Sequence, residues 1–252
     1  MTKLLRRAAL VALIAPLSLG LAACGSKDSP AGTAEKGEKI AAIAPPAGKQ
    51  WADVITVTPE DGYRMGNPDA PLKLVEYASL TCPHCAHFSA EGGAKLREQY
   101  VASGVVSYEL RNQIHDGLDL TMAMLTRCGT PESYIALSEQ VWANQEAIVQ
   151  GVQANGEKVE AAMKLENQSA RYKAIADAAG LTEFFAARGI SRDQAATCLA
   201  KPGFAEAIVQ RSTKQSEELG IDGTPSFLLN GSKIEPQTWE ALEPVLQSAG
   251  AR

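Results

Sequence analysis

The fold is decided by residues 72–85, LKLVEYASLTCPHC, in which a short apolar run leads into a pair of cysteines. The run at 72–77 has the length and composition of a buried strand. A helix is expected next, because apolar residues recur at helical spacing from Cys85 onward and Pro83 stands where a first turn tolerates a missing N–H. The Gly92-Gly93 pair suggests a kink in this helix. We therefore expect a strand that ends just before the cysteines and a helix that begins at them.

The rest of the chain indicates an α/β fold with a helical region inside it. Residues 105–110, VVSYEL, are expected to form a second strand, parallel to the first across a βαβ unit. Residues 117–219 repeat their apolar positions at helical spacing and contain no comparable strand. Strand character returns at 226–229, SFLL, and the Asn230-Gly231 turn leads to a short partner strand around 233–234.

Composition argues against two broad classes of function. The chain has 252 residues, with 24 Lys and Arg against 29 Asp and Glu, and it carries no basic stripe of the kind that binds nucleic acid. It has only three histidines, which makes an imidazole-rich zinc or haem site a poor expectation: His84, His87 and His115. Cys128 and Cys198 stand alone rather than as a second C-x-x-C motif. We expect no metal, no other cofactor and no nucleic acid partner.

The N-terminus has the pattern of a secretion signal. Residues 1–23 carry three cations near their start and then an apolar run at 8–21. A membrane-spanning helix, the alternative, needs about 20 uninterrupted apolar residues, and this run is shorter and broken. The run ends in LAACG at 21–25, which resembles the lipobox of bacterial lipoproteins, whose cysteine is lipidated and becomes the first mature residue. This resemblance implies lipidation at Cys24, with the outer membrane as the favoured destination.

Residues 24–50 are expected to form a flexible tether. They are rich in Ala, Gly, Pro, Lys and Ser, and Ile40 and Ile43 are their only large apolar residues. Such a segment cannot bury enough apolar surface to become ordered. Its average reach of about 28 Å would hold the folded part of the chain clear of the lipid headgroups.

Cys82-Pro83-His84-Cys85 is the motif that carries chemistry. Cys82 stands at the expected helix start, where the helix dipole and free N–H groups favour a thiolate, and His84 is expected to add positive charge or a hydrogen bond. Cys82 is therefore the expected nucleophile and the exposed thiol. Cys85, one turn further on and facing inward, is the thiol expected to resolve a mixed disulfide. Half of a zinc knuckle and an inert structural disulfide are the alternatives to a redox centre.

The chain resembles the DsbA family of thiol:disulfide oxidoreductases. The resemblance rests on the succession of strand, Cys82-Pro83-His84-Cys85, helix, strand, helical region and finally Gly223-Thr224-Pro225-Ser226-Phe227. It implies an α/β architecture of the thioredoxin fold with an inserted α-helical domain. Residues 51–110 and 201–252 would form the thioredoxin-like domain, and residues 111–200 would form the helical insertion.

The resemblance also implies roles for residues outside the cysteine motif. Pro225 matches the family's cis-proline, and Thr224 before it would expose its backbone to an extended substrate peptide. Glu76 matches the buried acid that members use near the resolving cysteine, and an ordinary glutamate facing solvent is the alternative. Some members carry a second disulfide in the helical insertion, where Cys128 and Cys198 fall. Two buried reduced thiols are the alternative there.

We interpret the protein as a thiol:disulfide oxidoreductase, lipid-anchored in the bacterial periplasm, that introduces disulfides into exported proteins. The resemblance implies reduced or unfolded exported polypeptides as substrates and a membrane redox partner of the DsbB type, and we expect a monomer. A disulfide isomerase or reductase is the alternative among enzymes, and Thr224 leaves it open because isomerase relatives often carry Thr there. A thioredoxin-like lipoprotein that binds or chaperones proteins without turnover is the alternative outside enzymes.

Overall fold

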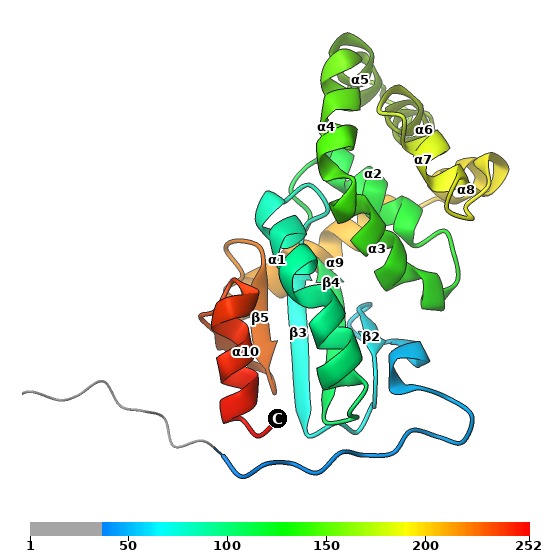
Figure 1. Cartoon of the computed structure of the whole chain (residues 1–252). Helices are drawn as coiled ribbons and strands as arrows, with labels where there is room; N and C mark the ends of the chain where they lie inside the picture. Colours follow the sequence, from blue (N-terminus) through cyan, green and yellow to red (C-terminus); the bar gives the residue numbers. More distant parts are fainter. Residues whose placement is uncertain (1–36) are drawn as a thin grey trace, which may run out of the picture. The chain divides into compact units, whose positions relative to one another are not determined.

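The computed structural model describes residues 37–252, and a mixed sheet of six strands lies at the centre of this part of the chain (Figure 1). The strands stand in the order β1-β2-β4-β3-β5-β6. Their bounds are Ile55–Val57 for β1, Tyr63–Met65 for β2, Leu72–Ala78 for β3, Val106–Asn112 for β4, Ser226–Leu229 for β5 and Ser232–Ile234 for β6. β3 and β4 pair in parallel, which confirms the prediction from the sequence, and the other pairs are antiparallel.

The central strand β3 is buried on both faces, which explains its almost continuous apolar run. Leu74 and Glu76 lie on the face that packs toward the first helix. Val75 and Tyr77 lie on the opposite face, in a cluster with Ile221. Side chains alternate between the two faces of a strand, so the residue between Val75 and Tyr77 must point into the other core. A glutamate is therefore held inside the protein by the register of β3.

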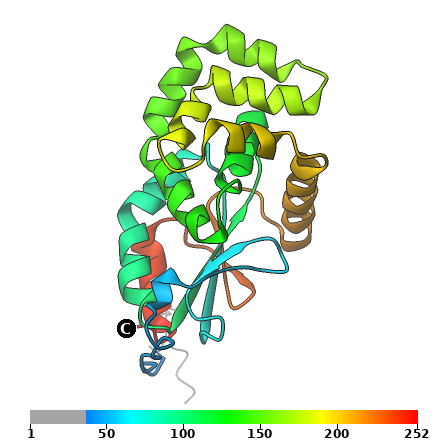
Figure 2. The same cartoon turned by 90° about the vertical axis from the view of Figure 1, so that its right-hand side faces the viewer.

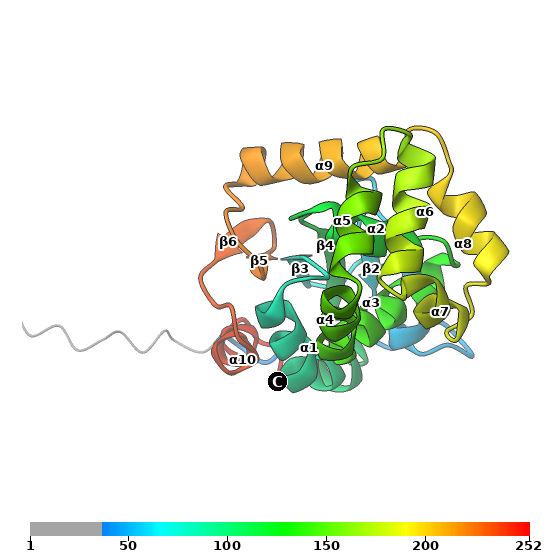
Figure 3. The ribbon, with the colours of Figure 1, turned by 90° about the horizontal axis from the view of Figure 1, so that it is seen from above.

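Helices cover both faces of the sheet. α1 (Pro83–Lys95), its π-helical continuation (Leu96–Val101) and α10 (Trp239–Ser248) lie on one face, and α9 (Phe204–Leu219) lies on the other, as the view from above shows (Figure 3). α1 begins at Pro83, as the sequence predicts. This layered arrangement places the N-terminal end of α1 at the edge where the parallel strands β3 and β4 end (Figure 1).

Gly92 allows close packing of α1 against α10. α1 runs without interruption through Gly92 and Gly93 to Lys95. A Cβ atom at Gly92 would lie 2.5 Å from the ring of Trp239 on α10, so only glycine lets the two helices approach this closely. The helical hydrogen bonding changes only afterwards, at Leu96.

Seven helices fill the chain between β4 and α9. Most of them gather beyond the end of the sheet at which α1 begins, and α3 (Tyr134–Ala143) packs alongside α1 (Figure 2). Their bounds are Gly117–Thr126 for α2, Tyr134–Ala143 for α3, Gln145–Ala154 for α4, Gly156–Met163 for α5, Gln168–Ala178 for α6, Leu181–Ala186 for α7 and Arg192–Leu199 for α8. The helical character expected for this region is confirmed. The helices cover the end of the sheet at which the cysteine motif lies (Figure 2).

Arg127 joins the helical region to the sheet. Tyr63 on β2 and Tyr134 on α3 stack with ring centroids 3.6 Å apart. The Arg127 guanidinium lies 5.3 Å from the Tyr63 ring centroid and 4.9 Å from that of Tyr134, which is the geometry of cation–π contacts. The Tyr134 hydroxyl donates a hydrogen bond to Asn112 at the end of β4, at 2.7 Å. These contacts fix α3 against the strands that carry the site.

Part of the expected flexible tether, residues 37–43, is held against the folded part of the chain by backbone hydrogen bonds. The N–H of Gly37 donates to the carbonyl of Ser248 at 2.8 Å, and the Trp51 indole N–H donates to the carbonyl of Ile43 at 2.7 Å. These hydrogen bonds involve the backbone, so they order the segment although it has few apolar side chains. We call residues 37–50 the strap.

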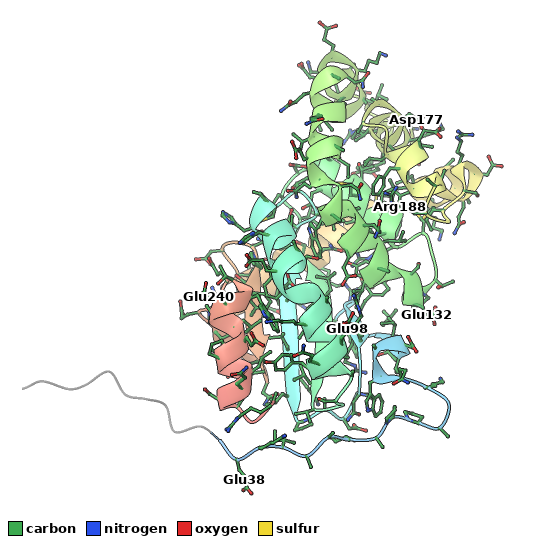
Figure 4. The ribbon with its side chains drawn as sticks, in the orientation of Figure 1. Glu38, Glu98, Glu132, Asp177, Arg188 and Glu240 are labelled. Atoms are coloured by element: carbon green, nitrogen blue, oxygen red, sulfur yellow. A yellow bond between two sulfur atoms is a disulfide. The ribbon has the colours of Figure 1, made fainter. Side chains whose placement is uncertain are left out.

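Two predictions from the sequence concern residues that the structure does not describe. Residues 1–23, the expected signal, and Cys24, the expected lipidation site, lie outside the described residues. Glu38, near the start of the strap, points away from the folded part (Figure 4). From residue 37 onward, the structure has no helix with the length and apolar character needed to cross a membrane.

The strands β1 and β2 were not expected from the sequence. Each has only three residues, which is too short for a pattern of alternating apolar positions to be recognised. They form a hairpin across the turn at 58–62, where the Thr58 hydroxyl donates to Glu109 on β4 at 2.7 Å. Contacts with residues far along the chain, on β4, therefore determine that these two short segments form strands.

Cys128 and Cys198 form a disulfide that joins the end of α2 to α8, with a Cα–Cα separation of 5.8 Å. We expect Cys128→Ser/Cys198→Ser to lower the free energy of unfolding by about 2–4 kcal/mol, because the bond closes a loop of 70 residues. Urea unfolding of the oxidised proteins measures this loss. The same comparison in thiol reductant is the control, because wild type and variant should then unfold at the same urea concentration. Alkylation of both thiols in protein isolated under oxidising conditions would contradict the prediction.

Candidate active site

The cysteine motif lies at the junction between β3 and α1. Cys82 is the N-cap residue of α1, and Pro83 occupies its first turn. The first N–H groups of a helix have no partner inside the helix, and the helix dipole places partial positive charge there. The Cys82 sulfur is thus attached at the point of α1 that best stabilises a negative charge.

Cys82 is the thiol whose ionisation the site favours. The pKa of Cys82 is lowered to about 5, first by a hydrogen bond from the Cys85 thiol, against the opposing effect of burial. Thr224 and the backbone N–H groups of Cys85 and His84 lower this pKa further. At neutral pH, Cys82 is therefore a thiolate.

Cys82 is not the exposed thiol that we expected. Only 6% of the residue is accessible to solvent, because the segment that carries Thr224 lies over it. The Cys82 Sγ is 3.3 Å from the carbonyl oxygen of Thr224. The Thr224 backbone therefore lies directly beside the Cys82 sulfur.

Cys85 has the opposite character. The residue is completely buried, and burial is the main reason that its pKa is raised far above the usual range of a thiol. Its hydrogen bond to Cys82 and the nearby carboxyl group of Glu76 raise this pKa further. Both motif cysteines are free thiols in this structure. The two are chemically unequal, because one ionises easily and the other holds its proton.

Glu76 lies inside the protein beneath the cysteines. Its side chain is inaccessible to solvent, which excludes the alternative of a glutamate facing solvent. The Tyr108 hydroxyl on β4 donates to Glu76 Oε2 at 2.6 Å. Burial raises the pKa of Glu76 to about 8, with smaller contributions from the negative charges of Cys82 and Glu139. A carboxyl group with this pKa can give or take a proton near neutral pH.

His84 contributes to the site through its backbone. Its side chain is exposed, and in residues 37–252 its ring makes no hydrogen bond. The backbone N–H of His84 is what helps to lower the pKa of Cys82. We expected the imidazole itself to supply a charge or a hydrogen bond. The described residues show no such hydrogen bond, and the contribution of charge stays a prediction. His87 is also exposed, with Nε2 3.3 Å from Glu91 Oε2.

The Thr224-Pro225 peptide bond faces the motif and is cis. Beside it lies a residue that the sequence analysis left without a role. His115 Nε2 is 3.3 Å from the Thr224 hydroxyl and 2.8 Å from Gln113 Oε1. No sequence signal distinguished His115, because it approaches Thr224 only through the fold.

The helical region holds the loop that leads into the motif. Asp119 on α2 accepts a hydrogen bond from the N–H of Leu80 at 2.8 Å. The Trp142 indole on α3 donates to the carbonyl of Ser79 at 3.0 Å, and the Gln145 amide donates to that of Leu80 at 3.2 Å. Residues from three helices thus fix two peptide groups just before Cys82.

Asp119 is the site residue that the sequence analysis missed most clearly. It is fully buried, and its second carboxylate oxygen accepts from the N–H of His115 at 2.9 Å. Burial raises the pKa of Asp119 to about 6. The sequence did contain a signal for Asp119, because this acid lies between Leu118 and Leu120 in an apolar helical segment. An acidic residue in an apolar segment is unusual and suggests a buried, paired carboxyl group.

The remaining expected residues lie apart from this set. The Cys128–Cys198 disulfide joins the end of α2 to α8, and within residues 37–252 its sulfur atoms make no hydrogen bond to the motif cysteines. Among residues 37–252, no group of three or more His, Cys, Asp or Glu side chains is arranged to hold a metal ion. The groups that the fold brings together at the motif are a thiolate, a protonated thiol and a buried carboxyl group.

Comparison with known proteins gives a family match and similar relatives. The sequence model of a family described as Thioredoxin matches residues 58–248. A Rickettsia bellii protein with the provisional name protein-disulfide oxidoreductase is 23% identical over 191 residues, which cover 75% of this chain and 65% of that protein. A Rickettsia typhi protein with the same provisional name is 26% identical over 172 residues, which cover 68% and 55%. The chain thus spans between about half and two thirds of the length of these curated relatives.

Solved structures share the fold. The crystal structure of a protein-disulfide isomerase from Novosphingobium aromaticivorans has a TM-score of 0.70 and 29% identity, covering 75% of this chain and 97% of that one. Wolbachia pipientis alpha-DsbA1 has a TM-score of 0.60 and 23% identity, covering 77% and 94%. The expected thioredoxin fold with an inserted helical region is confirmed. Because the family match extends over more than half of its length, the chain belongs to the thioredoxin family.

Proposed function

We propose that the protein exchanges disulfides with polypeptide substrates through Cys82 and Cys85. The observation that carries this proposal is the inequality of the two thiols. The pKa of Cys82 is lowered to about 5 at the end of α1, whereas that of buried Cys85 is raised. A low-pKa thiol that is joined to a partner thiol one turn away suits reversible two-electron exchange.

The reaction follows from this inequality. In the oxidised protein, a substrate thiolate attacks the Cys82 sulfur, the Cys82–Cys85 bond breaks, and Cys85 leaves and takes up a proton. A second substrate thiolate then attacks the substrate sulfur of the mixed disulfide, and Cys82 leaves as a thiolate. The substrate loses two electrons and the cysteine pair gains them. A partner disulfide accepts these electrons when the pair is oxidised again.

Glu76 is proposed as the proton acceptor and donor for Cys85. The raised pKa of the Cys85 thiol means that it must lose its proton to attack and regain one when it leaves. Glu76 is the buried carboxyl group whose charge raises that pKa, and its own pKa of about 8 suits proton exchange near neutral pH. We propose in addition that the backbone beside Pro225, at Thr224, docks an extended substrate peptide over Cys82.

The oxidase direction is the favoured one. A stabilised thiolate at Cys82 makes the reduced pair more stable and the disulfide more oxidising. The isomerase or reductase direction stays the second candidate, because the similar Novosphingobium structure is described as a protein-disulfide isomerase. The reduction potential of the Cys82/Cys85 pair decides between them. A value of about −120 mV supports an oxidase, and one of about −270 mV supports a reductase.

We also propose that the protein works in the bacterial envelope, on reduced or unfolded exported polypeptides and with a membrane redox partner of the DsbB type. The sequence at 21–25 supports lipidation of Cys24, with the outer membrane favoured. Mass spectrometry of the mature N-terminus in the native host tests this, and we expect acyl chains on Cys24. Cleavage elsewhere, or a mature protein without acyl chains, would contradict the anchor but not the exchange chemistry.

The roles of the two cysteines can be separated by substitution. We expect Cys82→Ser to abolish disulfide exchange, because it removes the ionised thiol. Cys85→Ser should instead accumulate mixed disulfides with substrate that reductant releases, because Cys82 still attacks but nothing resolves the product. Insulin reduction and hirudin oxidation measure the activity, and non-reducing electrophoresis measures the trapped species. Trapping by Cys82→Ser in place of Cys85→Ser would overturn the assignment, and wild type inactive in both assays would favour the non-catalytic alternative.

The pH dependence of the Cys82 thiolate can also be tested. Ultraviolet absorbance of the reduced protein should show a thiolate that ionises with a midpoint at about 5. Cys85→Ala should raise this midpoint, because it removes the hydrogen bond that lowers the pKa most. His84→Ala is the matched comparison within the motif, and it should change the midpoint less, because its backbone N–H remains. A larger shift in His84→Ala than in Cys85→Ala would show that the imidazole acts after all.

The same ionisation links stability to pH. Because the pKa of Cys82 is lower in the folded reduced protein than the ordinary thiol value of 9.0, the thiolate adds stability that is complete above pH 9. This contribution falls as the pH decreases and is lost near pH 5. As the pH rises from 5 to 9, the free energy of unfolding of reduced wild type should therefore increase relative to that of Cys82→Ser.

A further inference from the structure

A small cavity lies on the inner side of the cysteine motif, between β3, α1 and α3. Its lining includes side chains from the sheet and from the helical region: Glu76, Phe88, Ser89, Tyr108, Glu139 and Trp142. The space open to a water molecule in it is about 10 Å³. That is at the lower limit of the roughly 10–15 Å³ that a cavity needs to hold one buried water. Two carboxyl groups, from Glu76 and Glu139, thus border a space of the size of one water.

Glu76 has one carboxyl oxygen without a partner in this cavity. Oε2 accepts the hydrogen bond from Tyr108, whereas Oε1 is buried and has no hydrogen-bond partner among the described residues. A buried polar atom without a partner is costly, so such an atom usually has a functional reason or a bound water. Because Glu76 has no access to solvent, a proton that it takes from Cys85 needs another group to reach the surface.

Glu139 connects the cavity with the solvent. It lies on α3, it lines the same cavity as Glu76, and 27% of its side chain is accessible to solvent. Both of its carboxylate oxygens lie 2.9 Å from Arg97 Nη1, on the π-helical continuation of α1. Of the two carboxyl groups on the cavity, Glu76 is sealed and Glu139 is partly open. A water in this cavity would link the sealed carboxyl group to the partly open one.

We propose that Glu139 is the solvent end of a proton route that runs from Cys85 through Glu76. This inference rests on the proposed exchange function and deepens it. While the reduced pair is being oxidised by a partner disulfide, Cys82 is held in a mixed disulfide with that partner. The Cys85 proton moves to the Glu76 carboxylate, and the Cys85 sulfur attacks the Cys82 sulfur. The Cys82–Cys85 bond forms, the bond from Cys82 to the partner breaks, and the partner thiolate leaves with the electron pair. The proton then leaves Glu76 for Glu139 and the solvent.

A purely structural role is the competing explanation, because the Arg97–Glu139 ion pair also ties α3 to the end of α1. Two variants separate the explanations. Arg97→Gln removes the same ion pair and keeps the carboxyl group on the cavity. Glu98→Gln is the matched control, because Glu98 also lies near Arg97, at 3.9 Å, but is 70% exposed and does not line the cavity (Figure 4).

The test measures the two steps of the reaction between the reduced full-length protein and oxidised glutathione. Cys82 attacks first and forms a mixed disulfide with glutathione, and Cys85 then resolves it. Acid quenching and mass spectrometry give both rates across a range of pH. We expect Glu139→Gln to leave the first rate unchanged and to slow resolution about tenfold, a modest effect for the loss of a proton-transfer group. Glu139→Asp should recover most of the rate.

The rate at which Cys85 resolves the mixed disulfide also has a pH dependence. The midpoint of this dependence would not change if a variant had only lost packing. In Glu139→Gln the midpoint of this profile should shift to lower pH, because the negative charge of Glu139 no longer opposes ionisation of Glu76. Arg97→Gln and Glu98→Gln should resolve the mixed disulfide at rates close to wild type. The first rate shows whether each variant has kept a folded site.

Three results would overturn the inference. Resolution by Glu139→Gln at the wild-type rate would show that the proton leaves by another route. An equal defect in Arg97→Gln and Glu139→Gln would show that the ion pair matters and the carboxyl group does not. A wild-type protein that forms no mixed disulfide with glutathione and also fails in the insulin and hirudin assays would remove the proposed function itself and this inference with it.

Discussion

The hydrogen bond between the Cys85 thiol and the Cys82 sulfur is the interaction on which the chemistry of the site depends. It is the largest single reason that the pKa of Cys82 is lowered, and the same bond contributes to the raised pKa of Cys85. It exists because Cys82 caps α1 while Cys85, one turn later, points into the core. The helix geometry therefore both assigns the two roles and connects them, so neither thiol can be altered without changing the other.

The helical region is part of the site as well as a cover over it. Asp119, Trp142 and Gln145 come from three different helices and hold the peptide groups that precede Cys82. Glu139, one turn before Trp142 on α3, borders the cavity beneath the cysteines. The strand β3 and helix α1 supply the reacting groups, and α2 to α4 keep the loop between them in place. A change in the packing of these helices would thus reach the thiols through hydrogen bonds to the backbone.

Local patterns in the sequence predicted the elements that carry the thiols, and long-range contacts explain the rest. The run at 72–77 and the proline after Cys82 were sufficient to predict β3, the start of α1 and the parallel partner strand. The strap was beyond prediction because backbone hydrogen bonds order it without an apolar pattern. The face of Glu76 was undecided because both faces of β3 are buried. His115 meets Thr224 across 109 positions of the chain, which no local pattern can reveal.

The buried Glu76 implies a compromise between durability and chemistry. Its pKa of about 8 in the fold, against the ordinary value of 4.5, means that the folded state is destabilised relative to the unfolded chain as the pH rises above 4.5. At pH 7 this cost is on the order of 3 kcal/mol, a large share of the net stability of a typical domain. An apolar residue of similar volume at this position would be expected to give a more heat-resistant protein with a poorer proton acceptor beneath Cys85. The carboxyl group at the centre of β3 is thus a point where selection for activity and selection for stability act in opposite directions.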